Sequence, residues 1–266
     1  MKVQGKVIVV TGAGSGMGRE LTLELTRRGA KVAAVDMRVE TLEETKKLAE
    51  SSGGQVSTHV LDVSDLAAVA ALPASVHKEL GEVDALINNA GIIQPFVKVN
   101  ELTMEQAKKV MDVNFYGPLA LVKAFLPTLL KRPEAHILNV SSMGAYAPVP
   151  GQSVYGASKA AIKLLTEGLH SELMETQVGV TIVFPGAIAT NIAANSGMTM
   201  DAADADSSKF KTTPAPLAAK LMVDAIENNT ARLCIGSDAK LMDKLSRLNP
   251  VFAAKLIYNQ MKSLLK

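Results

Sequence analysis

The stretch KVIVVTGAGSGMGREL, residues 6–21, decides how the rest of the chain is interpreted. A β-branched run comes first, and it leads through the closely spaced glycines Gly12, Gly14, Gly16 and Gly18 into a segment with helical character. Glycine lets the backbone approach a ligand closely, and the free N–H groups and dipole of a helix N-terminus favour a phosphate. The spacing departs from G-x-G-x-x-G, because Met17 stands at the place of the third glycine. The order of strand, turn and helix nevertheless predicts a dinucleotide-binding crossover.

Further β-branched runs follow, separated by longer segments with helical character. They are KVAAV (31–35), QVSTHVL (55–61), VDALI (83–87), AHILNV (135–140), VGVTIVF (178–184) and ARLCI (231–235). Alternating strands and helices indicate βαβ units, and nearly continuous apolar strands indicate a parallel sheet covered on both faces. The fold class predicted is therefore α/β, a doubly wound parallel (Rossmann-like) sheet that binds ligands beyond the carboxyl ends of its strands.

The composition excludes several classes of protein. With 266 residues, 48% of them hydrophobic, the chain can form one α/β domain. A formal net charge of +2, few aromatic residues and no Trp argue against nucleic acid as a partner. Cys234 is the only cysteine, which excludes an internal disulfide and a Cys-rich metal site. With no apolar run of transmembrane length and no room for a signal peptide before Gly12, we expect a cytoplasmic protein.

The stretch SVYGASKAA, residues 153–161, places the phenol of Tyr155 four residues before the ammonium of Lys159. On a helix, residues at this spacing project from the same face. A nearby cation favours a phenolate, so the pair predicts a lowered pKa at Tyr155. The alternative is a chance pairing on a helix surface, and the pair alone does not decide between the two.

Motifs elsewhere in the chain decide the question. TGAGSGMG (11–18), NNAG (88–91), YGASK (155–159) and PGAIAT (185–190) stand in this order. Over about residues 5–236, the chain thereby resembles the short-chain dehydrogenase/reductase family. The resemblance implies a short-chain alcohol dehydrogenase or ketoreductase of class EC 1.1.1, in which a tyrosine exchanges a proton with the substrate oxygen.

The resemblance implies a role for each catalytic residue. Tyr155 is the proton donor or acceptor, and Lys159 lowers its pKa and holds the cofactor ribose. Ser142, which lies thirteen residues before Tyr155 and beside Ser141, positions the reacting oxygen. Asn114, in MDVNFYG, matches a helix asparagine thought to support a water-linked proton path, although it could also be an ordinary polar helix residue.

The resemblance also implies a site for NAD. Asp36 ends the second strand, where a carboxylate accepts hydrogen bonds from the ribose of NAD and repels the 2′-phosphate of NADP. Met37 stands where NADP-preferring members of the family commonly carry a cation, and Arg38 leaves NADP as the less favoured alternative. The cofactor-binding residues expected are Gly12, Ser15, Gly16, Met17, Gly18, Asp36, Asp62, Val63, Asn89, Ala90, Gly91, Tyr155, Lys159, Pro185, Gly186, Ile188 and Thr190.

The substrate site is expected to be apolar. Its candidate residues are Ser142, Met143, Ala145, Val149 and Ile192, with Ile188 nearby, and they favour a hydrophobic secondary alcohol or ketone. Residues 191–216 are expected to form a substrate lid. The aspartates Asp201, Asp204 and Asp206 within it miss the EF-hand spacing, so no metal site is predicted.

The chain is expected to form an oxidoreductase domain over residues 1–236 and an amphipathic helical extension over residues 237–266. Asn249 and Pro250 predict a helix start. Two apolar stripes, Leu241, Leu245 and Leu248, then Ala253, Ile257, Met261 and Leu264, predict faces that pack over the lid or against a partner subunit. A membrane surface is the less favoured partner for these helices.

Two other functions remain open from the sequence. One is a non-catalytic dinucleotide-sensing or scaffold protein. The other is an NADP-preferring reductase of lipid-type ketones at a membrane surface. By its resemblance, the protein is also expected to form a homo-oligomer, either a dimer or a tetramer.

Overall fold

A computed structural model describes residues 1–190, 192, 196, 212–262 and 265. Its main sheet has seven strands in the order β3-β2-β1-β4-β5-β6-β9, and every neighbouring pair is parallel. The strands are β1 (Val7–Thr11), β2 (Lys31–Asp36), β3 (Gln55–Val60), β4 (Ala85–Asn88), β5 (Ala135–Val140), β6 (Val178–Pro185) and β9 (Arg232–Ile235). The predicted doubly wound α/β fold is confirmed. The strand order reverses between β1 and β4, which opens a crevice at the carboxyl ends of these strands.

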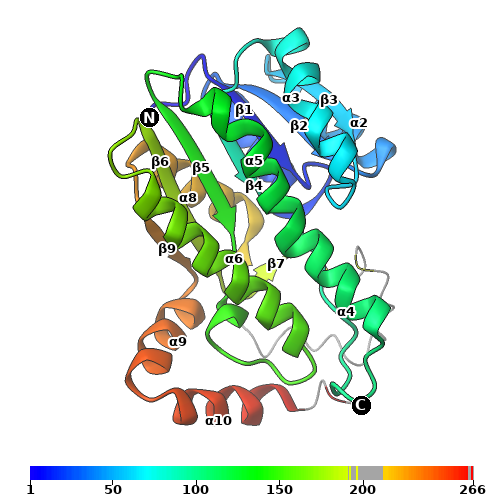
Figure 1. Ribbon diagram of the computed structural model, residues 1–266, viewed down its shortest axis with the longest axis vertical. Coiled ribbons are helices and arrows are strands. Elements are labelled where there is room, and N and C mark those ends of the chain that lie inside the picture. The colour runs from blue at the N-terminus through cyan, green and yellow to red at the C-terminus, as the bar shows by residue number, and fades with distance from the viewer. Residues whose placement is uncertain (191, 193–195, 197–211, 263–264, 266) are drawn as a thin grey trace.

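Helices cover both faces of the sheet (Figure 1). They are α1 (Gly16–Arg27), α2 (Val39–Glu50), α3 (Leu66–Leu80), α4 (Met104–Met111), α5 (Gly117–Leu129), α6 (Ser153–Glu172) and α8 (Ala215–Glu227). A π-helical segment, Asp112–Tyr116, joins α4 to α5, and a 3₁₀ turn, Met143–Ala145, follows β5. A small second sheet pairs β7 (Ile188–Ala189) with β8 (Thr213–Pro214).

The core has two layers because side chains alternate across each strand. In β1, Ile8 and Val10 pack with residues of α1, α2 and α8 on one face, while Val7 and Val9 pack with α3, α5 and α6 on the other. Both faces are therefore buried, which explains why the strands appear in the sequence as nearly continuous apolar runs.

Two helices, α9 (Ser237–Leu248) and α10 (Pro250–Met261), lie apart from the sheet, near the segment that follows β5 (Figure 1). The predicted helix start is confirmed, because the side chain of Asn249 accepts a hydrogen bond of 2.9 Å from the Phe252 N–H. Ala253 and Ile257 pack with Met242 in a separate apolar cluster, as the second stripe predicts. Of that stripe, Leu264 lies outside the described residues.

The predicted stripe on α9 is found only in part, because Leu245 packs against the apolar cluster that contains Met242 while the other two leucines are exposed. Leu241 is 54% exposed and Leu248 is 83% exposed, whereas Ala239 and Met242 are buried. The hydroxyl of Tyr146 donates to the Ala239 carbonyl at 2.9 Å, which turns the Ala239 side of the helix toward the protein. Leu241 and Leu248 consequently point outward.

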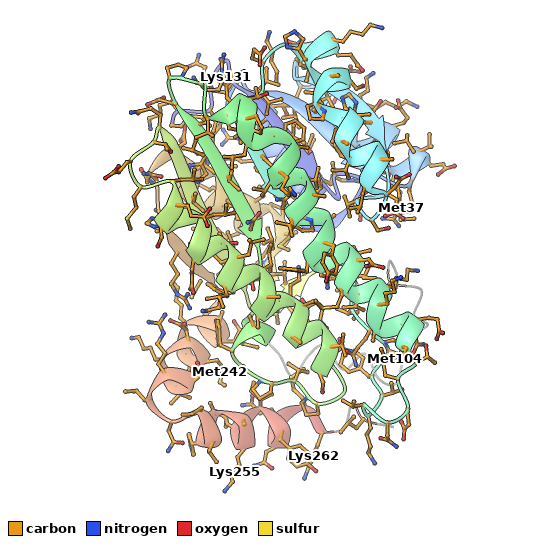
Figure 2. The ribbon with its side chains drawn as sticks, viewed as in Figure 1. Met37, Met104, Lys131, Met242, Lys255 and Lys262 are labelled. Atoms are coloured by element: carbon orange, nitrogen blue, oxygen red, sulfur yellow. The ribbon has the colours of Figure 1, made fainter. Side chains whose placement is uncertain are left out.

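The buried side of α9 and α10 covers the segment after β5, where Met143, Tyr146 and Val149 pack against the helices. Figure 2 shows Lys255 and Lys262 projecting away from the rest of the protein. Most of the predicted lid, residues 191–216, lies outside the described residues. Among the helices that the structure describes, none has the length and apolarity needed to cross a bilayer.

Candidate active site

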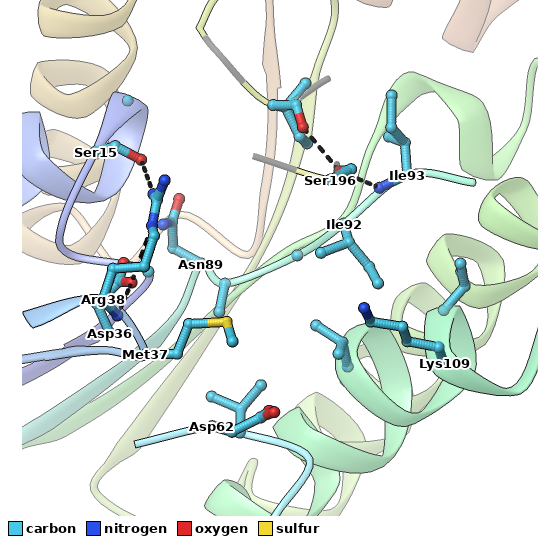
Figure 3. A pocket seen from close by; sticks show the side chains of 18 of the residues that line it. Ser15, Asp36, Met37, Arg38, Asp62, Asn89, Ile92, Ile93, Lys109 and Ser196 are labelled. Atoms are coloured by element: carbon cyan, nitrogen blue, oxygen red, sulfur yellow. Dashed lines mark hydrogen bonds and ion pairs between the residues drawn. The ribbon is translucent and has the colours of Figure 1, made fainter. Parts of the chain in front are cut away.

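A cavity of about 670 Å³ lies at the carboxyl ends of β1, β2 and β4 (Figure 3). This is the crevice expected where the strand order reverses. Most of the predicted cofactor-binding residues line it, namely Gly12, Ser15, Gly16, Met17, Asp36, Asp62, Val63, Asn89, Ala90, Gly91 and Thr190.

The glycine-rich turn forms one wall of the cavity. Gly12 and Gly16 have φ values of +68° and +52°, a backbone conformation that favours glycine. A Cβ atom on Gly12 would lie 3.0 Å from the Ala90 Cα, and one on Gly16 would lie 3.3 Å from Cγ2 of Thr190. The turn therefore packs closely against the segment after β4 and the segment around Thr190.

Gly18 was predicted to bind the cofactor, but it does not line the cavity. A Cβ atom there would overlap the carbonyl oxygen of Gly12. Its lack of a side chain instead allows the first turn of α1 to pack against the glycine-rich turn.

Asp36 and Arg38 share one corner of the cavity (Figure 3). One carboxylate oxygen of Asp36 accepts from the Gly14 N–H at 2.9 Å, and the other accepts from the Arg38 N–H at 3.1 Å. The guanidinium of Arg38 donates to the Ser15 hydroxyl at 3.0 Å, and its Nε lies 3.8 Å from Asp36 Oδ1. A negative and a positive group thus stand side by side where the two cofactors differ.

The residues of the cavity fit a dinucleotide. The side chain of Asn89 donates to the Thr11 carbonyl at 2.9 Å, which holds the amide in place. Its Oδ1 is buried and has no hydrogen-bond partner in the described part of the chain. Buried polar atoms are normally paired, so an acceptor without a partner on the cavity wall suits a donor from a ligand such as a ribose hydroxyl.

Lys159 and Asn114 lie directly behind this wall. A Cβ atom on Gly91 would lie 3.1 Å from Lys159 Nζ and 3.2 Å from Asn114 Oδ1. Lys159 is 4% exposed, and its ammonium donates to the Val140 carbonyl at 3.0 Å. Nζ lies 6.0 Å from the ring centroid of Tyr155, one helical turn earlier on α6.

The two neighbouring serines have different surroundings. The Ser141 hydroxyl donates to the Lys159 carbonyl at 2.7 Å and is buried. The Ser142 hydroxyl accepts from the Gly144 N–H at 3.0 Å, and a Cβ atom on Gly144 would lie 3.4 Å from both Ser142 Oγ and the Tyr155 ring. Ser142 is therefore the serine that lies beside the tyrosine.

Burial controls the electrostatics of the pair. It raises the pKa of the Tyr155 hydroxyl, and the Ser142 hydroxyl beside it acts in the opposite direction. Burial lowers the pKa of Lys159 to about 8. In the protein without a bound cofactor, the pKa of Tyr155 is therefore raised, and the predicted lowering by Lys159 is not found. The physical reason is that loss of hydration disfavours the charged form of both groups.

Asn114 lies in the π-helical segment between α4 and α5. Its Oδ1 accepts from the Ile92 N–H at 2.9 Å. Its Nδ2 donates to the Ile92 carbonyl at 2.8 Å and to the Ser158 hydroxyl at 3.0 Å. Insertions of this kind are frequent at functional sites, and this one places the amide between the cavity wall and α6.

Residues 6–201 match the family described as short chain dehydrogenase. The chain belongs to the short-chain dehydrogenase/reductase family. SadH of Mycobacterium tuberculosis, described as an oxidoreductase, is 36% identical over 253 residues, which cover 92% of this chain and 91% of SadH.

Solved structures agree with this assignment. A short-chain dehydrogenase/reductase from Burkholderia phymatum, in complex with NAD, has a TM-score of 0.85 and 28% identity, over 94% of this chain and 98% of that chain. A short chain dehydrogenase from Burkholderia cenocepacia, in complex with NADP, has a TM-score of 0.80 and 28% identity, over 97% and 99%. Both complexes support a nicotinamide dinucleotide as the cofactor, without choosing between NAD and NADP.

Some residues predicted for this short-chain dehydrogenase lie away from the cavity wall. Pro185 ends β6, and the N–H of the following Gly186 donates to the Ile235 carbonyl at 2.9 Å. The side chain of Ile188 is half-buried and packs against the core. Tyr155 is also not among the residues that line the cavity.

The predicted substrate wall is only partly found. Ile192 lines the cavity, whereas Met143 and Val149 pack against the buried side of α9 and α10. Ala145 is half-buried in the 3₁₀ turn. The helices α9 and α10 therefore pack against the apolar segment beside Ser142.

The sequence did not indicate three residues at this site. Gln94 and Lys109 line the cavity, and Figure 3 shows Lys109 extending into it from α4. The Asp238 carboxylate accepts from the Ala187 N–H at 2.7 Å, which secures the loop after β6. Asp238 has a weak sequence signal, since acidic residues favour the first turn of a helix. No cluster of His, Cys, Asp and Glu that could hold a metal ion occurs among the residues that the structure describes.

Proposed function

We propose that the protein is an NAD(H)-dependent oxidoreductase that interconverts a hydrophobic secondary alcohol and its ketone. One observation carries the proposal. Tyr155 lies beside the Ser142 hydroxyl on a helix whose Lys159 ammonium lies behind Gly91 in the wall of the dinucleotide cavity. A proton donor thereby adjoins the place where the reactive end of a dinucleotide would lie.

When bound, the cofactor supplies or accepts the hydride. Tyr155 donates a proton to the carbonyl oxygen during reduction and takes it from the alcohol during oxidation. Ser142 donates a hydrogen bond to the same oxygen and holds it near the phenol. Lys159 contributes positive charge below its pKa of about 8, which favours the phenolate during alcohol oxidation.

We propose a preference for NAD, supported by the Asp36 carboxylate in the cavity wall. The carboxylate can accept from ribose hydroxyls and disfavours a phosphate by like charge. Arg38 supports some tolerance of NADP, because its guanidinium at Ser15 lies beside the same corner.

We further propose a homo-oligomer. Large apolar side chains are exposed at the two ends of α5 and on α6, among them Tyr116, Leu130 and Leu164. A contact between copies of the chain would cover them. Light scattering during gel filtration tests this proposal, and a monomer at micromolar concentration would contradict it.

The function is tested by a screen of secondary alcohols and ketones, followed by the absorbance of the reduced cofactor. We expect turnover of hydrophobic ketones with NADH, and turnover lower by about 10² to 10⁴ with Tyr155→Phe. If NADH binds but no alcohol or ketone reacts, the protein is a dinucleotide-sensing or scaffold protein instead.

A further inference from the structure

Gln94 is a fully buried polar residue outside the family motifs of the chain. It follows the NNAG segment by three positions and lies against the start of α6. Its side-chain oxygen accepts from the Val154 N–H at 2.8 Å and from the Tyr155 N–H at 3.0 Å. Its side-chain nitrogen donates to the Gly151 carbonyl at 2.9 Å. Three polar groups of one neighbouring segment are thus paired by a single amide.

These contacts replace a missing helix cap. The first N–H groups of a helix have no partner within it and are normally paired by the side chain of the residue at the N-cap. In α6 the N-cap residue is Gln152, whose side chain makes no capping hydrogen bond, and the first turn contains no acidic residue. Gln94 supplies the acceptor from a segment 60 residues away.

The same segment holds the other side of Tyr155. The Tyr155 carbonyl accepts from the Ser158 hydroxyl at 2.7 Å, and that hydroxyl accepts from Asn114 Nδ2 at 3.0 Å. The side chain of Asn114 in turn accepts a hydrogen bond from the Ile92 N–H and donates one to the Ile92 carbonyl. Ile92 and Gln94 are two residues apart, so the hydrogen bonds close a ring through Asn114, Ser158 and Tyr155.

We propose that Gln94 is a positioning residue that fixes the backbone of Tyr155 and hence the place of its hydroxyl for proton transfer. The inference deepens the proposed function and rests on it for the catalytic consequence. The amide acts through the main chain of Tyr155, and an alignment error of about 1 Å can lower the rate of a reaction by roughly a hundredfold.

The test compares Gln94→Met with a matched control. Methionine keeps the length and burial of the side chain but cannot pair with the N–H groups. The control is Gln152→Met, because Gln152 is also buried and donates to the Gln94 carbonyl at 2.7 Å, yet none of its side-chain hydrogen bonds reaches Tyr155. Gln94→Asn, whose amide is one methylene shorter, serves if the methionine variant does not fold.

The first measurement needs no substrate. Hydrogen exchange of the Val154 and Tyr155 amides should rise by about tenfold or more in Gln94→Met and stay within about twofold in Gln152→Met. Unchanged exchange in Gln94→Met would overturn the proposal. If the unaltered protein reduces no ketone, the proposed function fails, and the exchange result still decides whether Gln94 holds Tyr155.

The second measurement uses NADH and the best ketone of the screen. We expect kcat to fall about ten- to a hundredfold in Gln94→Met, with the KM for NADH within about twofold. The solvent deuterium isotope effect on kcat should increase, since proton transfer becomes slower, whereas simple loss of folded protein would leave it unchanged. An equal loss of kcat in Gln152→Met, or an unchanged isotope effect, would overturn the proposal.

Discussion

Replacement of Asp36 by alanine is expected to weaken NADH binding and to leave NADPH binding unchanged or stronger. The carboxylate stands at the end of β2 in the cavity wall, beside the guanidinium of Arg38. Its loss removes the acceptor for the ribose hydroxyls and the charge that repels a 2′-phosphate.

The magnitude follows from the hydrogen bonds lost. Hydrogen bonds to a charged group contribute about 1.5–3 kcal/mol, so NADH affinity should fall roughly ten- to a hundredfold. The free energy of unfolding should also fall, because the Gly14 and Arg38 N–H groups lose their acceptor. A buried donor left unpaired costs about 1–3 kcal/mol, and the Gly14 bond is the buried one.

The assay is a fluorescence titration with NADH and NADPH, together with kcat/KM for both cofactors. Arg38→Met is the matched variant, expected to lose NADPH selectively because it removes the cation near Ser15. Asp36→Ala combined with Met37→Arg should favour NADPH. A preference of the unaltered protein for NADPH would refute the reasoning. An equal loss of affinity for NADH and NADPH in Asp36→Ala would also refute it, since that result would mean that the glycine-rich turn itself collapses.

Three further outcomes are expected. Tyr155→Phe should retain the fold and NADH binding but lower kcat by about 10² to 10⁴, and a loss below tenfold would exclude its acid–base role. Removal of residues 249–266 should uncover Met143 and Val149, so solubility or substrate range should change while NADH binding persists; identical stability, oligomeric state and kinetics would contradict this. His136, whose pKa burial lowers from 6.5 to about 3, should make stability fall as pH drops below 6.5, and His136→Gln should flatten that fall in urea unfolding.

The sign of the His136 effect follows from proton binding. Between pH 3 and 6.5 the unfolded chain takes up a proton that the folded chain does not, so acid favours unfolding over this window. Above pH 6.5 the His136 ring is neutral in both the folded and the unfolded chain, so its full contribution to the free energy of unfolding is present. Its full size is roughly 5 kcal/mol, because the pKa falls from 6.5 to about 3 and one pKa unit corresponds to about 1.4 kcal/mol. In the folded protein the neutral ring is paired with the Thr181 hydroxyl at 2.8 Å.

The sheet was predictable because burial on both faces leaves a strong sequence signal. Each predicted run contains or overlaps an observed strand, and β5 spans residues 135–140 as predicted. The exposure of Leu241 and Leu248 on α9 was not predictable, because leucine spacing alone gives a periodicity and not the side that packs. That side depends on the contact between Tyr146 and Ala239, which are far apart in the chain.

The site was predictable where a local motif carries it. The glycine-rich turn, Asp36 and the NNAG segment all reach the cavity. Local sequence could not indicate the contacts of Gln94 or Asp238, because each pairs with a backbone group more than fifty residues away, and the position of Asp238 in the first turn of a helix is only a weak signal. Local sequence also could not indicate that burial raises the pKa of Tyr155, against the lowering expected from Lys159. The pKa depends on the whole structure that surrounds the hydroxyl.

The segment after β4 joins these observations. Asn89 is bonded to Thr11 of β1, Ile92 to Asn114, and Gln94 to the start of α6. One short segment therefore touches the glycine-rich half of the sheet, the cavity and the helix of the acid–base residue. A change within it should alter cofactor binding and proton transfer together, unless, as at Gln94, the altered side chain pairs only with the start of the catalytic helix and the residues just before it. We expect a change at Gln94 to slow proton transfer without weakening cofactor binding, and a change at Asn89 to affect both. This pair of results would show that the segment sets the distance between the cofactor and the Tyr155 phenol.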